Sequence, residues 1–292
     1  MLAALLAALA PAPTAAQAPA APRPAEPALW VVSDHDTTVY LFGTIHLLPK
    51  GIDWQRGKLS DALVKSDELV IETIVDEKNP MQFNMALNSL AFGSTLPPLR
   101  ERVDEDKRAE LDAAVTAGGL PPTAYDRMET WAVAVLLLGA KFRKIGLSPE
   151  DGVEMILRKR FAESNKPIEA LETMVEQLGY FDRLPEEAQR SLLEGVIVTD
   201  KDMQTDFGAM LEAWQKGDVD KIAKTFDTDL AESPPLRDAL MVQRNRNWAT
   251  WVEQRMARPG TVLVAVGAGH LAGTDSVQRY LETRGLEVRR VQ

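Results

Sequence analysis

The chain has no cysteine among its 292 residues and only three histidines. The missing thiols exclude disulfide bonds, thiolate-bound zinc and a cysteine nucleophile, although they do not identify the redox compartment. Positive charge is also scarce, because 33 basic residues face 43 acidic ones and the formal net charge is −10. No basic footprint supports contact with a phosphate backbone, so nucleic acid is not an expected partner.

Long hydrophobic runs are missing as well. The apolar run at residues 1–10 is too short to cross a bilayer, and an Ala/Pro-rich tract follows it to residue 27. Such a run resembles the core of a secretory signal peptide, although no Lys or Arg precedes it. We therefore expect residues 1–28 to be a signal peptide and linker. The mature protein is expected to be periplasmic or secreted, without a stable transmembrane anchor.

The composition is 45% hydrophobic and 26% charged, which is typical of globular proteins. The length suits one large α/β domain or two small ones, and no repeat of solenoid period is visible. We treat residues 29–292 as a single domain. Nothing in the sequence gives firm grounds for an oligomeric state.

Two of the three histidines follow a strand-like apolar run at the same spacing. Residues 38–42 lead into Gly43-Thr44-Ile45-His46, and residues 262–266 lead into Gly267-Ala268-Gly269-His270. Glycine at a strand exit lets the backbone turn tightly and approach a ligand, while imidazole can bind a metal or move a proton. Our central prediction is that His46 and His270 converge on one site. The alternative is that each imidazole only packs or hydrogen-bonds at the edge of a sheet.

The N-terminal part predicts a β-hairpin and a βαβ unit. Strands at residues 29–32 and 38–42 flank a polar turn that contains His35, which is expected to be solvated. An amphipathic helix at residues 58–66 and a buried strand at 68–72 follow. Strand, helix and strand in this order indicate parallel pairing.

The C-terminal part repeats this order, with a strand at residues 262–266, a helix at 275–283 and a last strand at 286–291. Residues 79–165 and 185–256 are helical in pattern and resemble an insertion or cap, separated by a short strand at 166–172 and a helix. We therefore predict an α/β fold. It has a central parallel or mixed sheet, βαβ units from both termini, and a large helical middle region that flanks and caps the sheet.

Carboxylates also stand at predicted strand ends. Ligands of open parallel sheets bind outside the carboxyl ends of the strands, where His46, Glu72 and Glu172 are expected to lie. The alternatives are that Glu72 only caps its strand exit and that Glu172 caps a helix. Arg244 and Asn245 lie on the long helix predicted at residues 236–256. Arg244 could bind a substrate carboxylate or steady an oxyanion, or it could simply be solvated.

Two imidazoles and one or two carboxylates are ligands for a divalent metal such as manganese, cobalt, zinc or iron. A metal-bound water is a hydrolytic nucleophile near neutral pH, and a second carboxylate can act as general base. The sequence has no Gly-x-Ser-x-Gly, no His-Glu-x-x-His, no P-loop and no Gly-x-Gly-x-x-Gly. A serine hydrolase, a zincin and a nucleotide-binding enzyme with those motifs are therefore poor fits.

Five segments in order resemble the TraB/GumN family over residues 29–292. They are Leu29-Trp30-Val31-Val32-Ser33-Asp34, Tyr40-Leu41-Phe42-Gly43-Thr44-Ile45-His46, Leu171-Glu172-Thr173, Arg244-Asn245-x-Asn247-Trp248 and Val266-Gly267-Ala268-Gly269-His270-Leu271-Ala272-Gly273. The broader group includes the Tiki proteins, which are metal-dependent proteases with paired Gly-x-x-His motifs, the erythromycin esterases and haem-binding ChaN-like lipoproteins. No hydrophobic anchor follows Gln292 and no lipidation cysteine is present, which weakens the ChaN-like comparison.

The resemblance implies metal-binding and catalytic positions at His46, Glu72 and His270, with Glu172, Arg244 and Asn245 as further catalytic positions. It implies an exported metal-dependent hydrolase that acts on a peptide or a small molecule, in the manner of the Tiki proteases. The alternative is a non-catalytic protein that binds haem, a metal or a peptide. A third possibility is that the Gly-x-x-His motifs only shape the sheet edge.

Overall fold

The computed structural model describes residues 23–74, 80–92, 95–147, 151–230 and 233–292. The apolar run expected to be a signal peptide lies outside these ranges. Within the segment expected to be a linker, β1 (Arg23–Pro24) pairs in parallel with β4 (Ile52–Asp53) as a small separate sheet. The backbone that the structure describes therefore includes part of the segment before residue 29.

The main sheet has six strands in the order β6-β5-β7-β3-β2-β8. Their bounds in chain order are β2 (Leu29–Ser33), β3 (Thr37–Thr44), β5 (Glu68–Ile71), β6 (Ile168–Ala170), β7 (Gly260–Gly267) and β8 (Arg289–Arg290). The pairs β3–β7, β5–β7 and β5–β6 are parallel, whereas β2 is antiparallel to both of its neighbours. The predicted α/β class and mixed sheet are confirmed.

The β2–β3 hairpin forms as predicted, and α1 (Gly57–Lys65) connects β3 to β5. However, β3 and β5 do not pair with each other, because β7 lies between them. The direct β3–β7 pairing places Gly43 opposite Val266 and Thr44 opposite Gly267. The two Gly-x-x-His segments therefore leave the sheet side by side.

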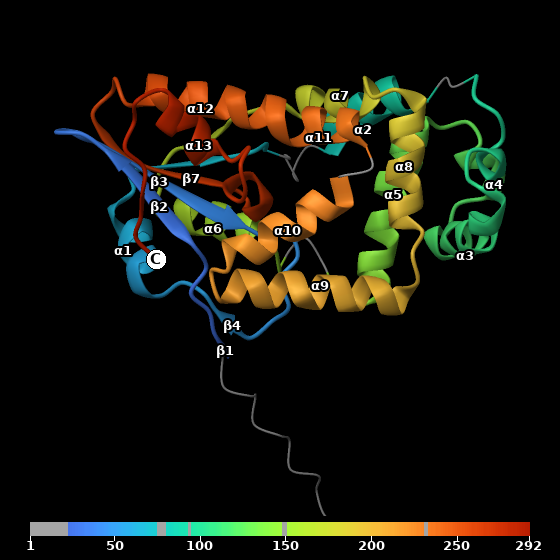
Figure 1. Cartoon of the computed structure of the whole chain (residues 1–292), viewed down its shortest axis with the longest axis horizontal. Helices are drawn as coiled ribbons and strands as arrows, with labels where there is room; N and C mark the ends of the chain where they lie inside the picture. Colours follow the sequence, from blue (N-terminus) through green and yellow to red (C-terminus); the bar gives the residue numbers. More distant parts are fainter. Residues whose placement is uncertain (1–22, 75–79, 93–94, 148–150, 231–232) are drawn as a thin grey trace, which may run out of the picture.

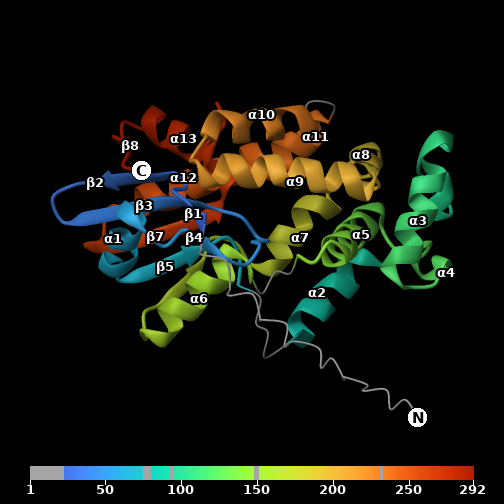
Figure 2. The ribbon, with the colours of Figure 1, turned by 90° about the horizontal axis from the view of Figure 1, so that it is seen from below.

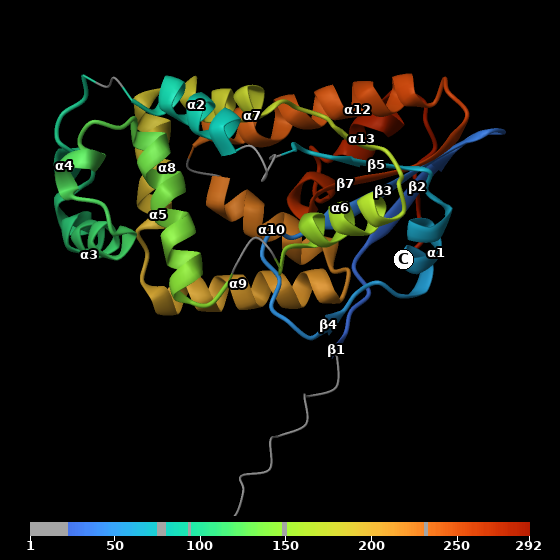
Figure 3. The same ribbon diagram turned by 180° about the vertical axis from the view of Figure 1, so that it is seen from behind.

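Helices cover both faces of the sheet (Figures 2 and 3). One core contains α1, α6 (Val153–Glu163) and residues of α9 (Asp200–Gln215), packed against Phe42 and its neighbours. The opposite core contains α12 (Gln243–Arg255) and α13 (Val277–Thr283), packed against Val39 and Leu41. This alternation along β3 is the period of two expected of a strand with two buried faces.

The helical middle region extends from the end of the sheet to which β3 points (Figure 1). Its remaining helices are α2 (Pro80–Ala91), α3 (Arg108–Gly118), α4 (Pro122–Tyr125), α5 (Thr130–Lys144), α7 (Met174–Asp182), α8 (Glu186–Val196), α10 (Val219–Leu230) and α11 (Pro234–Arg237). A π-helical turn at Asp238–Val242 joins α11 to α12, where one long helix was predicted.

None of the helices in the described ranges has the length and apolar character needed to cross a membrane. The strand predicted at residues 286–291 is shorter than expected, since only β8 forms.

Candidate functional site

His270 is buried beside the carboxyl end of β7, in the 3-10 turn Ala268–Leu271. Its Nδ1 lies 2.6 Å from Oδ1 of Asn245, whose amide nitrogen donates to the carbonyl of Asp275 at 2.7 Å. Because the amide oxygen faces the ring, Nδ1 is the protonated nitrogen and Nε2 is left as an acceptor. Burial lowers the pKa of His270 to about 3, so this imidazole is neutral at ordinary pH.

Glu72 directly follows β5 and is buried against the same edge. Its Oε1 accepts from the backbone N–H of Gly267 at 2.7 Å and lies 3.8 Å from Nε2 of His270. Its Oε2 accepts from Arg244 at 2.6 Å and from Gln177 at 3.3 Å. Burial alone raises the pKa of this carboxyl, but His270, Arg244 and the other neighbours outweigh it and lower the pKa to about 2. Glu72 is thus a fixed carboxylate.

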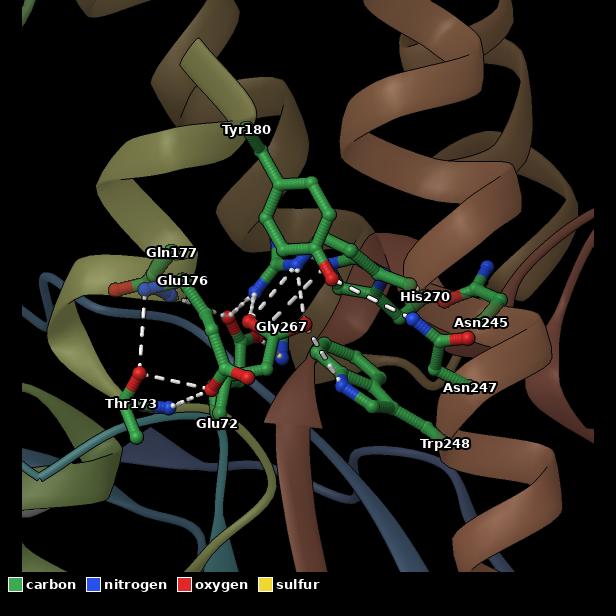
Figure 4. A network of polar contacts seen from close by, with 12 residues as sticks. Glu72, Thr173, Glu176, Gln177, Tyr180, Asn245, Asn247, Trp248, Gly267 and His270 are labelled. Carbon is green, nitrogen blue, oxygen red and sulfur yellow. Dashed lines mark hydrogen bonds and ion pairs between the residues drawn. The ribbon is translucent and has the colours of Figure 1, made fainter. Parts of the chain in front are cut away.

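Arg244 lies between the two carboxylates and His270. Figure 4 shows Glu72, Trp248 and His270 gathered at this edge of the sheet. Its Nη2 contacts Glu172 at 2.9 Å as well as Glu72, and its Nη1 lies 3.3 Å from Nε2 of His270. Burial opposes the charged form, yet the two carboxylates raise the pKa of this guanidinium. Glu172 also accepts from the indole N–H of Trp248 at 2.9 Å, and burial raises the pKa of its carboxyl. The cluster is a dense ion network with its charges almost entirely out of water.

His46 occupies the other side of this edge, beyond the end of β3. Its side chain is 66% exposed, and its Nδ1 lies 2.8 Å from Oε1 of Glu154 on α6. The hydroxyl of Thr44 donates to the same oxygen. The charge of Glu154 raises the pKa of His46 to about 9. This pairing occupies Nδ1, so Nε2 is the ring nitrogen left for a ligand.

Gly267 is the point around which the predicted ligands gather. A Cβ added to it would lie 3.2 Å from Oε1 of Glu72, 3.5 Å from Cδ2 of His270 and 3.9 Å from Nε2 of His46. The three residues expected to bind a metal are therefore neighbours, as the strand-end argument predicted. However, their ligand atoms do not all lie within 4.8 Å of one another.

A tight group of ligand atoms occurs elsewhere. Within the ranges that the structure describes, Asp34, His35 and Asp36 form such a group, with all three atoms within 4.8 Å of one another. These residues lie in the exposed hairpin turn, and the side chain of His35 is 86% exposed, as expected of a solvated turn residue.

The helices α9 and α10 each contact one of the Gly-x-x-His segments. Trp214 of α9 donates its indole N–H to the carbonyl of Gly43 at 2.8 Å. Phe226 of α10 covers Gly269, where an added Cβ would lie only 2.5 Å from the ring. Gly269 is therefore needed for close packing of α10. Gly43 is needed for a different reason, because an added Cβ would lie 3.1 Å from the Cα of Ala268 in the other segment. The two helices contact the turns that carry both histidines.

An outer layer comes from α7, which begins with a capping box between Thr173 and Glu176. Tyr180 accepts from Asn247 at 3.5 Å, and its ring lies 5.7 Å from the Arg244 guanidinium carbon. Trp248 contacts the same guanidinium at 4.7 Å. The guanidinium of Arg244 thus makes cation–π contacts with both aromatic rings, and these contacts help to hold its planar group in place.

Sequence reasoning missed Glu154, Gln177 and Tyr180. Each stands on a helix with ordinary polar surface spacing, and each reaches the site only through tertiary packing. Trp248 was noticed beside Arg244, but its hydrogen bond to Glu172 was not anticipated. No local pattern could have identified these contacts, because they join segments that are far apart in the chain.

A family model for the TraB/PrgY/gumN family matches residues 28–290. The chain belongs to this family. The match includes every segment that contributes to the site, from the β2–β3 hairpin to the second Gly-x-x-His, and it confirms the resemblance drawn from the sequence motifs.

Two curated relatives of this TraB/PrgY/gumN member carry the same name. The chain is 24% identical over 255 residues to "Uncharacterized protein YbaP" of Escherichia coli (strain K12), covering 87% of this chain and 92% of that protein. It is similar at the same identity and coverage to "Uncharacterized protein YbaP" of Shigella flexneri. No solved structure matches the chain significantly.

Proposed function

We propose that this protein is an exported metal-dependent hydrolase, with His46, Glu72 and His270 as the metal ligands and a peptide bond as the target. One observation carries the proposal. Each histidine has its Nδ1 held by a side-chain oxygen, from Glu154 and Asn245 respectively, which leaves Nε2 for a ligand. Nε2 of His270 lies 3.8 Å from Oε1 of Glu72, and Nε2 of His46 lies near Gly267, whose N–H donates to the same oxygen. Metal-binding histidines characteristically hold their second nitrogen in this way, which sets the tautomer and the ring orientation.

The donor set fits manganese, cobalt or zinc, which accept imidazole and carboxylate ligands. When bound, such a metal would acidify a water molecule to give a nucleophile near neutral pH. Two adjustments of the protein accompany binding. His46 would have to release the proton that Glu154 stabilises, and Nε2 of His270 would have to give up its contact with Arg244.

The other residues have roles that follow from their contacts. Arg244, fixed by Glu72 and Glu172, supplies a buried positive charge suited to a substrate carbonyl oxygen or oxyanion. Glu172 has a raised pKa and is suited to hold or transfer a proton. Asn245 orients His270 without itself facing the ligand atoms. Glu72, whose carboxyl is ionised, would hold the metal together with the two histidines.

Haem binding is less well supported. A haem pocket is apolar around its axial ligand, whereas His270 lies next to Glu72 and Arg244. A metal or peptide carrier without catalysis shares the same ligands, so the two functions are distinguished by turnover.

The test measures bound metal and peptide cleavage on the same preparations. The purified protein would be analysed for metal and incubated with a mixed peptide library, with and without Mn²⁺, Co²⁺ or Zn²⁺. The variants are His46→Ala/His270→Ala and, as a matched control, His35→Ala, which removes the remaining histidine from the exposed turn. We expect about one metal per chain and cleavage in the wild type and the control, and neither in the double variant.

Metal without cleavage would favour the carrier over the hydrolase. Metal that persists in the double variant and disappears in His35→Ala would place the ion in the hairpin turn. A folded wild type with neither metal nor cleavage contradicts the proposal.

A further inference from the structure

A second hollow lies at the β2–β8 edge of the sheet, away from the two Gly-x-x-His segments. It is a groove of about 500 Å³ between α1 and the C-terminal residues. These two segments are close neighbours in all the views of the ribbon (Figures 1 and 2). The volume is that of a small-molecule site.

The floor of this groove is bare sheet. Val31 pairs with Tyr40 and with Arg289, and Ser33 pairs with Thr38, so these residues share one face. Helix α1 is short and covers only part of that face. The hydroxyl groups of Ser33, Thr38 and Tyr40 therefore line the floor and offer hydrogen bonds.

The walls of the groove carry mostly positive charge. Lys58 and Lys65 come from α1, and Arg289 and Arg290 come from β8. Asp61 is the acidic residue in the lining. Four cations against one carboxylate reverse the balance of a chain whose net charge is −10.

The cations differ in how they are held. Arg290 is fixed, because its guanidinium donates to the carbonyls of Gln292 and Gly217, both at 2.6 Å, and lies over the ring of Trp30. Among the described residues, the exposed side chains of Lys58, Lys65 and Arg289 form no ion pair with an acidic side chain. Three unpaired cations around a concave surface are suited to an anionic ligand rather than to internal ion pairs.

We propose that this groove binds a small soluble polyanion with two or more phosphate groups. Arginine and lysine on opposite walls can contact separate phosphates, with the planar guanidinium matching phosphate geometry. A neighbouring hollow of about 660 Å³ shares Lys58, Asp61 and Arg290 with the groove and adds Lys216 and Glu26, so it extends the concave surface with little further net charge. The site is independent of the proposed hydrolase centre.

The test is calorimetric titration of the full chain with inorganic tripolyphosphate at low salt, with orthophosphate for comparison. The groove variant is Lys58→Gln/Lys65→Gln/Arg289→Gln. A matched control, Lys107→Gln/Arg127→Gln/Lys201→Gln, removes the same charge from exposed positions outside the groove. We expect saturable tripolyphosphate binding that weakens about tenfold or more in the groove variant and less than about twofold in the control.

Equal weakening in both triple variants would show a non-specific charge effect and overturn the proposal, as would a wild type that binds no tripolyphosphate. A third arm uses vesicles of phosphatidylglycerol. Binding to vesicles without binding to tripolyphosphate contradicts the soluble ligand, because the groove would then face a lipid surface. Circular dichroism of each variant shows that the fold is retained.

Discussion

Two hydrogen bonds decide the chemistry available to the histidines, and both involve Nδ1. Glu154 holds Nδ1 of His46 at 2.8 Å and Asn245 holds Nδ1 of His270 at 2.6 Å. A carboxylate favours the charged imidazole, whereas a neutral amide in a buried place does not. The pKa of His46 is accordingly raised and that of His270 is lowered.

Asn245→Asp tests this assignment. It places a carboxylate against Nδ1 of His270 and should raise the pKa of that ring from about 3 by more than a unit. Histidine side-chain NMR on metal-free protein measures the change, and only three rings need assignment. The control is Asn247→Asp, two residues further along α12. An unchanged His270 titration would contradict the proposed tautomer.

Gly267→Ala tests whether Glu72, His46 and His270 form one metal-binding site. Its methyl group would lie 3.2 Å from Glu72 Oε1, so the carboxylate must move by a few tenths of an ångström. We expect a stability loss of about 1 kcal/mol. We expect a loss of metal affinity or turnover of roughly tenfold or more, since ligand geometry is strict. Gly195→Ala, at a helical position with open space, is the control. Unchanged metal binding would count against the site.

At the scale of elements, the site depends on one strand pairing and one pair of helices. Pairing of β3 with β7 aligns the two Gly-x-x-His turns, and α9 and α10 then pack over them. The turns have little regular structure of their own, so these helices provide much of their rigidity.

Trp214→Phe removes the indole donor to the carbonyl of Gly43 while keeping most of the ring. An unsatisfied buried carbonyl costs about 1–3 kcal/mol, and urea denaturation should show a loss in that range. Trp251→Phe, at a half-buried position of α12, should cost less. If both variants are equally stable, the indole contact does not hold the turn.

Hydrophobic periodicity was sufficient to predict β2, β3, β5 and β7, because their apolar runs end at clear turn residues. The rule for strand carboxyl ends then placed His46, Glu72 and His270 at one edge. The order of the strands could not be predicted in this way. Strand β7 lies between β3 and β5 in the sheet, although it comes from the C-terminal part of the chain. Hydrophobic periodicity predicts which face of a strand is buried, but it does not predict which strands pair with each other.

The residues that contact the proposed metal ligands could not be predicted from local sequence patterns either. Glu154 reaches His46 because Val153, at the start of α6, donates its backbone N–H to the carbonyl of Ile45. Gln177 reaches Glu72 because α7 follows β6. Both residues look like ordinary helix surface in the sequence. Arg244 and Asn245 were singled out as a cluster, but their separate contacts with carboxylates and with His270 needed the fold.

At the scale of the whole molecule, the perturbed groups make folding stability depend on pH. His270 stays neutral in the folded protein down to about pH 3 but has a reference pKa of 6.5, so stability falls as the pH drops through that range. Glu72 adds a loss between its reference pKa of 4.5 and about 2. His46 acts on the other side, because its stabilising charge is lost as the pH rises from 6.5 to about 9.

Stability should therefore be greatest near pH 6.5 and fall on both sides, with the alkaline fall smaller because the exposed His46 is screened by solvent. Urea denaturation from pH 3 to pH 9 measures the curve. His270→Gln should flatten the acid side and His46→Gln the alkaline side. An acid side that His270→Gln leaves unaltered would contradict the assignment of a neutral buried imidazole.

The most direct test of the account is an anomalous difference map from crystals soaked with Zn²⁺ or Co²⁺. We predict one strong peak within bonding distance, about 2.0–2.2 Å, of Nε2 of His46, Oε1 of Glu72 and Nε2 of His270. Arg244 should have withdrawn from His270 in that crystal. A peak only at the Asp34–Asp36 turn, or an ion-free edge with the Arg244 contact intact, would contradict the claim that the paired histidines form a metal centre.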